Sequence, residues 1–308
     1  MSDSRTVSVR AVVVNYRTYE LVETCIAALK TSAAAPEDLV VVDNESDPQK
    51  VAALVQALPT IRVVASPGND GYARACNQGW KGATTDFVLF INPDVTVRPD
   101  CIARCLEACT QDQSIGIVTC RLVRPDGTLD HACHRGIPTP VASLAYALRL
   151  DRVWPRSRRL ARYTMAWLDP ETVHDVEACS GAFMLVRRSA LEAVGGWDER
   201  YWFYAEDLDL CLRVGHAGLR VRYVGTATAT HIKGASSHLR ERSRDLAPRE
   251  LTHKRMIQGA IVDSHSLFFR EHFEGTTAWP ISTAIRAMFA AQRLRLRLAT
   301  QLDAALRR

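Results

Sequence analysis

The sequence lacks any long hydrophobic run. No stretch of its 308 residues approaches the roughly 18 consecutive apolar residues of a membrane-spanning helix. The apolar run near the N-terminus is too short for the core of a secretory signal peptide. Paired CxxC spacings are also missing, and nine cysteines, an odd number, do not suit a disulfide framework. We therefore expect a chain without membrane spans that works in the reducing cytoplasm.

Negative charge is scarce in two segments. Six arginines and one acid, Asp303, lie in residues 279–308, and six more arginines lie in residues 149–162. Such clusters suit an acidic partner, although a solvated protein face has the same composition. Apolar positions that share one helical face after Trp279 suit a tail that lies on an anionic membrane surface. A homodimer contact and packing on the rest of the chain remain alternatives, and no motif supports nucleic-acid binding.

Apolar strands and helical periods alternate over the first 110 residues. The sequence predicts strands over 7–14, 39–42, 61–65 and 87–91, and helices over 19–31, 51–58, 73–82 and 101–110. Strands that are apolar throughout and alternate with helices indicate an α/β fold, with a mostly parallel central sheet flanked by helices. Later segments predict strands over 115–122, 127–129, 182–186 and 219–224, a helix over 206–217, and mainly helix from residue 249.

Polar residues follow three of the predicted strands. They are Asn15-Tyr16, Asp43-Asn44 and Asn92-Pro93-Asp94. Open α/β sheets bind ligands at the carboxyl ends of their strands. A carboxylate such as Asp43 accepts hydrogen bonds from a base or ribose, and Tyr16 offers a stacking face. Asp94 is an oxygen ligand suited to Mg²⁺ or Mn²⁺.

The loop that opens the third predicted helix carries Gly71, Arg74 and Asn77. Glycine permits close backbone approach, and the N-terminus of the helix faces the same sheet edge. Arg74 lies in the first helical turn, where its charge opposes the helix dipole. A bound anion would balance that charge; an ordinary surface arginine is the alternative.

An unbroken aromatic run, residues 201–204, leads to Glu206 and Asp207 at the start of a predicted helix. Carboxylates are stabilised there by the helix dipole, so both residues also suit simple capping. Because capping does not need the aromatic run, we favour a role for Asp207 as general base. His231 follows a predicted strand, where it either completes a metal site with Asp94 or is an ordinary loop histidine.

Together these segments resemble the family 2 glycosyltransferases, particularly their bacterial rhamnosyltransferase-like branch. The matching motifs are Val13-Val14-Asn15-Tyr16, Val41-Val42-Asp43-Asn44, Asn69-Asp70-Gly71-Tyr72, Asn92-Pro93-Asp94, Gly196-Trp197-Asp198-Glu199, Ala205-Glu206-Asp207 and His231-Ile232-Lys233-Gly234. The resemblance covers residues 7–236 in consistent order. It implies a GT-A fold, an inverting reaction and a nucleoside-diphosphate sugar donor, either a dTDP- or a UDP-sugar.

The resemblance also implies roles for single residues. The nucleotide sugar would contact Asn15, Tyr16, Asp43, Asn44, Gly71, Arg74, Asn77, Asn92 and Asp94. Asp207 would be the catalytic base, with Trp197 and Glu206 on the acceptor side. Asp94 and His231 would bind Mg²⁺ or Mn²⁺. Asn92 stands where the family's DxD motif usually has an acid, which predicts a weaker metal site.

The implied function is transfer of a sugar, with rhamnose from dTDP-rhamnose as the first candidate, to a glycan or polyprenyl-diphosphate-linked acceptor. This would serve cell-envelope polysaccharide synthesis at the inner face of the membrane. We expect a catalytic domain over 1–248, with 1–115 on the donor side and 116–248 on the acceptor side, and a basic helical extension over 249–308. A nucleotidyltransferase acting on sugar phosphates and a non-catalytic nucleotide-sugar-binding protein are the alternatives.

Overall fold

The computed structural model describes residues 7–44, 47–232 and 248–305. The strands are β1 (Val9–Asn15), β2 (Asp38–Asp43), β3 (Arg62–Ala65), β4 (Phe87–Ile91), β5 (Val95–Val97), β6 (Ile115–Val123), β7 (Val173–Val176), β8 (Phe183–Arg187) and β9 (Arg220–His231). The helices are α1 (Tyr19–Lys30), α2 (Pro48–Ala57), α3 (Tyr72–Trp80), α4 (Cys101–Thr110), α5 (Pro140–Ala147), α6 (Leu150–Val153), α7 (Arg188–Val194), α8 (Glu206–His216), α9 (Pro248–His272) and α10 (Trp279–Ala305). Short 3₁₀ helices span His131–Cys133 and Glu274–Thr276.

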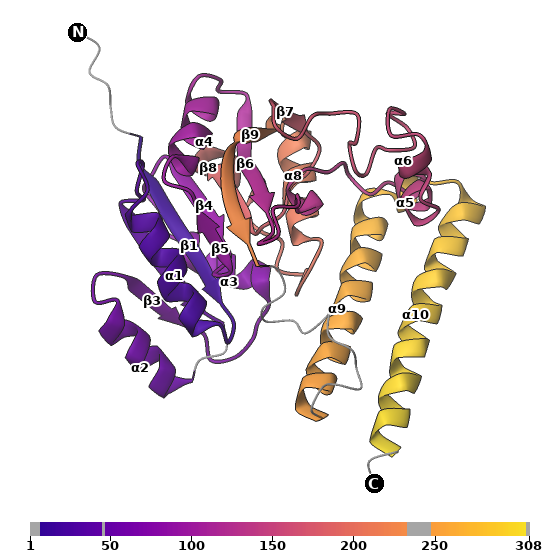
Figure 1. Cartoon of the computed structure of the whole chain (residues 1–308). Coiled ribbons are helices and arrows are strands. Elements are labelled where there is room, and N and C mark those ends of the chain that lie inside the picture. The colour runs from indigo at the N-terminus through magenta and orange to yellow at the C-terminus, as the bar shows by residue number, and fades with distance from the viewer. Residues whose placement is uncertain (1–6, 45–46, 233–247, 306–308) are drawn as a thin grey trace.

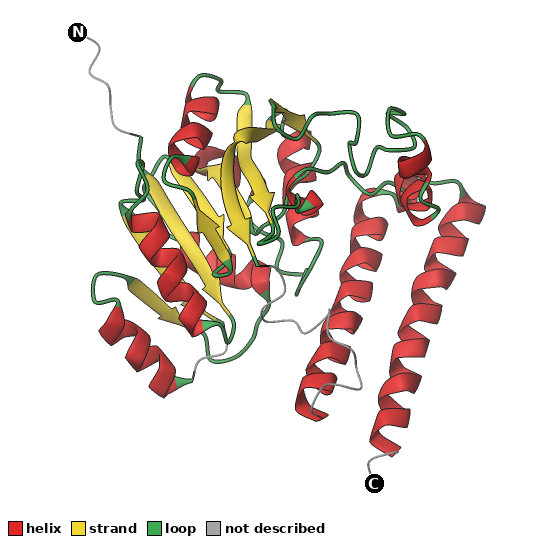
Figure 2. Ribbon diagram, viewed as in Figure 1, coloured by secondary structure: helices red, strands yellow, loops and turns green. Residues whose placement is uncertain are grey.

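All of the described strands belong to one sheet. Its order is β3-β2-β1-β4-β8-β6-β9-β5, and β7 pairs with β9. Helices flank the sheet, while α9 and α10 form a long pair beside it (Figures 1 and 2). Within the described ranges, no helix combines the length and apolar content required to cross a membrane.

The N-terminal half of the sheet is parallel. β1 pairs in parallel with β2 and β4, and β2 pairs in parallel with β3. Asn15 lies beside Asp43 in register, and Val13 lies beside Ile91. The carboxyl ends of β1, β2 and β4 therefore share one edge of the sheet, as the sequence predicts. All seven residues of β1 are buried, as expected for a strand covered on both faces.

The second half of the sheet is mixed. β8 runs antiparallel to β4 and β6, whereas β9 is parallel to β6 and antiparallel to β5. Because β8 reverses direction, it begins at the edge where β4 ends, and the Asn92 N–H donates to the Ala182 carbonyl at 3.0 Å. The sequence analysis did not predict β5, β7 or α7. These elements have three, four and seven residues, too few to show a period.

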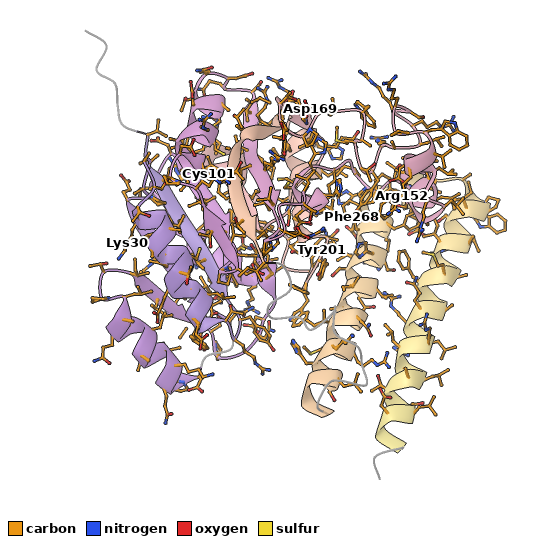
Figure 3. All side chains as sticks on the ribbon, in the orientation of Figure 1. Lys30, Cys101, Arg152, Asp169, Tyr201 and Phe268 are labelled. Atoms are coloured by element: carbon orange, nitrogen blue, oxygen red, sulfur yellow. The ribbon has the colours of Figure 1, made fainter. Side chains whose placement is uncertain are left out.

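The C-terminal helices are present as predicted, but they differ in how they pack. Phe268 of α9 is 3% exposed and belongs to the main hydrophobic core. Phe268 and Tyr201 mark the place where α9 meets the sheet domain (Figure 3). His272 of α9 also hydrogen-bonds Asp209 of α8 at 2.8 Å. By contrast, Ser282 is the one buried side chain among those described in α10.

Candidate active site

A cleft lies at the sheet edge where β4 ends and β8 begins. Eight of the residues predicted from the sequence line it: Tyr16, Asn44, Gly71, Asn92, Asp94, Glu206, Asp207 and His231. The cleft therefore brings together predicted donor residues, metal ligands and the predicted base from six separate parts of the chain.

His231 lies between two carboxylates in one corner of this cleft. Its Nδ1 is 2.9 Å from Asp130 Oδ2, and its Nε2 is 3.4 Å from Asp94 Oδ1. Burial alone would lower the pKa of His231, but the hydrogen bonds to Asp130 and Asp94 raise it. Since the Asp130 carboxylate requires a proton on Nδ1, neutral His231 presents the lone pair of Nε2 to Asp94.

This corner fits one divalent cation. Asp94 offers a carboxylate oxygen and His231 an imidazole nitrogen; both are ordinary ligands for Mn²⁺, and the two atoms lie 3.4 Å apart. The described residues contain no group of three or more His, Cys, Asp or Glu side chains placed to bind a metal. Asp94 and His231 could therefore supply two ligands to a divalent cation.

The Asp207 carboxylate is fixed by three donors. Arg135 Nη2 donates to its Oδ2 at 2.7 Å, and the Gly181 N–H donates to the same oxygen at 3.3 Å. The Leu208 N–H donates to Oδ1 at 2.8 Å. Burial would lower the pKa of Arg135, but the Asp207 charge raises it. Arg135 lies 72 positions from Asp207 in a segment without periodicity, so no local pattern indicated its role.

Glu206 differs from its neighbour. It lines the cleft and is 6% exposed, yet its Oε2 has no hydrogen-bond partner among the described residues. Burial, together with the nearby Asp207 charge, raises the pKa of Glu206 well above its usual value. The neutral form of Glu206 is favoured, and a neutral carboxyl can donate a hydrogen bond to a substrate oxygen.

The backbone before α8 is strained. Tyr204 and Ala205 have φ values of 70° and 67°, in the left-handed region that non-glycine residues seldom adopt. Both residues line the cleft. Strain of this kind persists where surrounding contacts impose it, and it is frequent at active sites. Here the strained backbone leads into the first turn of α8, whose Glu206 and Asp207 line the cleft.

Helix α9 forms a wall of the cleft that the sequence analysis did not predict. His253, Ile257 and His265 line it at spacings of four and eight residues, which places them on one helical face. The ring of His253 stacks on Tyr16 at 5.4 Å, so one face of the tyrosine is covered by protein. The spacing was visible in the sequence, but the orientation of the helix was not.

Asn15 and Asp43 lie behind the cleft rather than in its wall. Both are fully buried. Asn15 Nδ2 donates to Asp43 Oδ1 at 2.6 Å, and the Tyr19 hydroxyl donates to Asp43 Oδ2 at 2.9 Å. Burial and this hydrogen bond raise the pKa of Tyr19 to about 12. The two residues thus support the sheet edge, and their contact with a nucleotide stays a prediction.

Three other predicted residues lie outside the cleft lining. Trp197 is 2% exposed and packs edge-on against Phe90 and Tyr72 in the core. The Asn77 amide holds the Trp197 backbone, with its Nδ2 2.9 Å from the carbonyl oxygen. Arg74 is half exposed, and its Nε lies 3.9 Å from Asp70 and 3.8 Å from Glu199; its contact with an anionic ligand stays a prediction. Lys233, part of the matching motif at His231, lies outside the described residues.

The sequence matches the family described as glycosyl transferase family 2 over residues 11–195. N-acetylglucosaminyl-diphospho-decaprenol L-rhamnosyltransferase of Mycobacterium tuberculosis (strain H37Rv) is 32% identical over 270 residues, covering 84% of this chain and 85% of the relative. Rhamnosyltransferase WbbL of Escherichia coli (strain K12) is 30% identical over 155 residues, covering 49% of this chain and 54% of WbbL.

A solved mannosyltransferase from Pyrobaculum calidifontis, in complex with GDP-Man and Mn²⁺, has a similar fold. The TM-score is 0.54 at 18% identity, and the match covers 98% of this chain and 85% of the other. The GT-A fold predicted from the sequence is confirmed, and the family match sets aside the nucleotidyltransferase alternative. The chain belongs to glycosyltransferase family 2 and is a glycosyltransferase.

Proposed function

We propose that this enzyme transfers rhamnose, with inversion, from dTDP-rhamnose to a hydroxyl of a polyprenyl-diphosphate-linked glycan at the cytoplasmic face of the membrane. The observation that carries the proposal is the joining of Asp94–His231 and Glu206–Asp207 in one cleft. The M. tuberculosis and E. coli relatives are both named rhamnosyltransferases, and the first name includes a decaprenol-diphosphate acceptor. These names support the choice of donor sugar and acceptor class.

Asp207 is the proposed base. Its carboxylate would take the proton of the acceptor hydroxyl as that oxygen attacks the anomeric carbon and the bond to the diphosphate breaks. Arg135 and the Gly181 N–H hold the carboxylate in place without filling every lone pair. Glu206, in its neutral form, would donate a hydrogen bond to a sugar oxygen.

Asp94 and His231 would hold Mg²⁺ or Mn²⁺. A bound cation would neutralise negative charge on the leaving diphosphate. Asp130 orients His231 for this role, and Asn92 adds a neutral amide to the same wall. Tyr16 and Asn44 are the proposed nucleoside contacts, because both line the cleft beside the sheet edge.

The substitution Asp207→Asn tests the proposed base. Since a well-placed base contributes about 10²–10⁴-fold, we expect turnover to fall by that factor. Binding of dTDP-rhamnose with Mn²⁺, followed by thermal shift, should persist. Transfer to a polyprenyl-diphosphate-linked N-acetylglucosamine acceptor is the activity to measure, and Asp112→Asn, at an exposed ion pair with Arg220, is the control. Near-normal turnover of the Asp207 variant would refute the assignment. A panel of UDP-, dTDP- and GDP-sugars tests the donor separately.

A further inference from the structure

Residues 138–161 form an excursion that leaves the catalytic domain and returns to the same point. The Ile137 N–H donates to Glu177 Oε2 at 2.8 Å, and Arg162 Nε donates to Glu177 Oε1 at 2.9 Å. Just outside these residues, the Gly136 N–H donates to the Tyr163 carbonyl at 2.9 Å. The excursion contains α5 and α6 and lies on the side of the molecule away from α1 and α2 (Figure 1).

The base of the excursion adjoins the active site. Arg135, which precedes it, lines the cleft and is paired with Asp207 at 2.7 Å. Ala132 lines the same cleft. The excursion therefore extends outward from the wall that holds the proposed base.

The excursion exposes an unusual amount of apolar surface. Six large apolar side chains are at least half exposed: Val141 50%, Leu144 61%, Tyr146 50%, Leu148 60%, Val153 63% and Trp154 53%. Val141 and Leu144 of α5 and Leu148, its C-cap, follow an i, i+3, i+7 spacing, which favours one side of the helix. Single exposed apolar residues are common, but a cluster of this kind marks an interaction site.

The same segment carries positive charge. Five arginines of the excursion are exposed: Arg149, Arg152, Arg156, Arg158 and Arg159. Its one acidic residue, Asp151, is buried. Within the described part of the chain, none of the five arginines is paired with a carboxylate, and Figure 3 shows Arg152 on the excursion, away from the sheet.

We propose that the excursion docks on an anionic lipid bilayer. Aliphatic and tryptophan side chains enter the boundary between headgroups and acyl chains, and arginines beside them bind anionic headgroups while their stems cover apolar surface. Docking through residues 138–161 would set the acceptor side of the cleft next to the membrane. The placement of the acceptor side next to the membrane rests on the proposed lipid-linked acceptor, whereas docking itself does not.

Co-sedimentation with vesicles tests the docking surface. The vesicles are phosphatidylcholine alone or phosphatidylcholine with phosphatidylglycerol, and no sugar donor is present. Two variants remove the apolar side chains and the positive charge separately. They are Leu144→Ser/Leu148→Ser/Trp154→Ser and Arg152→Ser/Arg156→Ser/Arg158→Ser. We expect each variant to lower the partition coefficient on anionic vesicles at least about ten-fold. For the arginine variant, the reason is that one arginine near such a surface raises this coefficient close to five-fold.

Matched controls lie on α10, where Leu294, Leu298 and Leu302 are exposed to a similar degree. The triple Leu→Ser variant at these positions should keep wild-type binding. Equal loss in the control, or unchanged binding of both excursion variants, would overturn the proposal. So would a concentration-dependent dimer that the excursion variants abolish. Thermal unfolding midpoints check that each variant is folded. Because the assay uses neither donor nor acceptor, its result is independent of the proposed transfer reaction.

Discussion

Asp130 determines how His231 presents its two ring nitrogens. The Asp130 side chain is 1% exposed; one oxygen accepts from the Ala132 N–H at 3.3 Å, and the other faces His231 Nδ1 at 2.9 Å. A carboxylate behind a metal-binding histidine fixes the tautomer and raises the basicity of the ligand. Asp130 would thus act on a cation held by Asp94 and His231 through the orientation of His231, as a positioning residue.

The substitution Asp130→Asn retains the shape of this site and changes its donor pattern. With the amide oxygen on the Ala132 N–H, the amide nitrogen would face His231 Nδ1 and favour a proton on Nε2, where the cation should bind. We expect the apparent Mn²⁺ affinity to fall about 10–100-fold. Titration of the transfer rate with Mn²⁺ measures it, with Asp126→Asn in an exposed turn as the control. An unchanged Mn²⁺ titration would refute the positioning role of Asp130.

At the scale of elements, Gly71 joins the start of α3 to the loop before α8. Its φ is +95° with ψ 164°, a region that is essentially limited to glycine. A Cβ at this position would lie 2.4 Å from the Trp202 carbonyl oxygen, which also accepts from the Tyr72 N–H at 2.9 Å. The close approach expected of Gly71 is therefore made by protein backbone, although Gly71 also lines the cleft.

Two glycine substitutions separate strain from crowding. Gly71→Ala adds a backbone collision to an unfavourable φ, so we expect the free energy of unfolding to fall by about 3 kcal/mol or more. Gly82 has a φ of +71° and no atom within 4 Å of an added Cβ, so Gly82→Ala should cost only about 1 kcal/mol. Urea unfolding measures both. Equal losses would show that Trp202 moves aside without cost.

At the scale of the whole molecule, α9 belongs to the folded domain by its contacts. Leu251 and Ile257 are at most 5% exposed, Phe268 lies in the main core, and His272 holds Asp209. Burying a large apolar side chain of this kind stabilises a fold by about 1.5–3 kcal/mol. The sequence-based boundary after residue 248 would remove all of these contacts.

Two truncated chains test that boundary. A chain ending at residue 248 should not fold stably, because the lost contacts equal most of a typical unfolding free energy of about 5–15 kcal/mol. A chain ending at residue 278 keeps α9 and should melt within a few degrees of the full chain, since α10 buries so little. Thermal unfolding measures both. Cooperative melting of the shorter chain at the full-length temperature would support the boundary at 248.

The sequence by itself determined the parallel half of the sheet and the residues at its edge. Hydrophobic periods and turn residues are local signals, and β4 and α4 begin and end where the sequence predicts. Parallel strands then bring Asn92 and Asp94 to the edge shared with Asp43, because their carboxyl ends point the same way.

Only the tertiary structure decided which side chains complete the site. Arg135 reaches Asp207, and Asp130 reaches His231, across 72 and 101 positions. α9 adds His253 to the wall near Tyr16. No local pattern encodes such pairs, since they form when separately specified elements pack against one another. The same packing buried Trp197 and left Arg74 with protein carboxylates, because the position of a side chain depends on what covers its element.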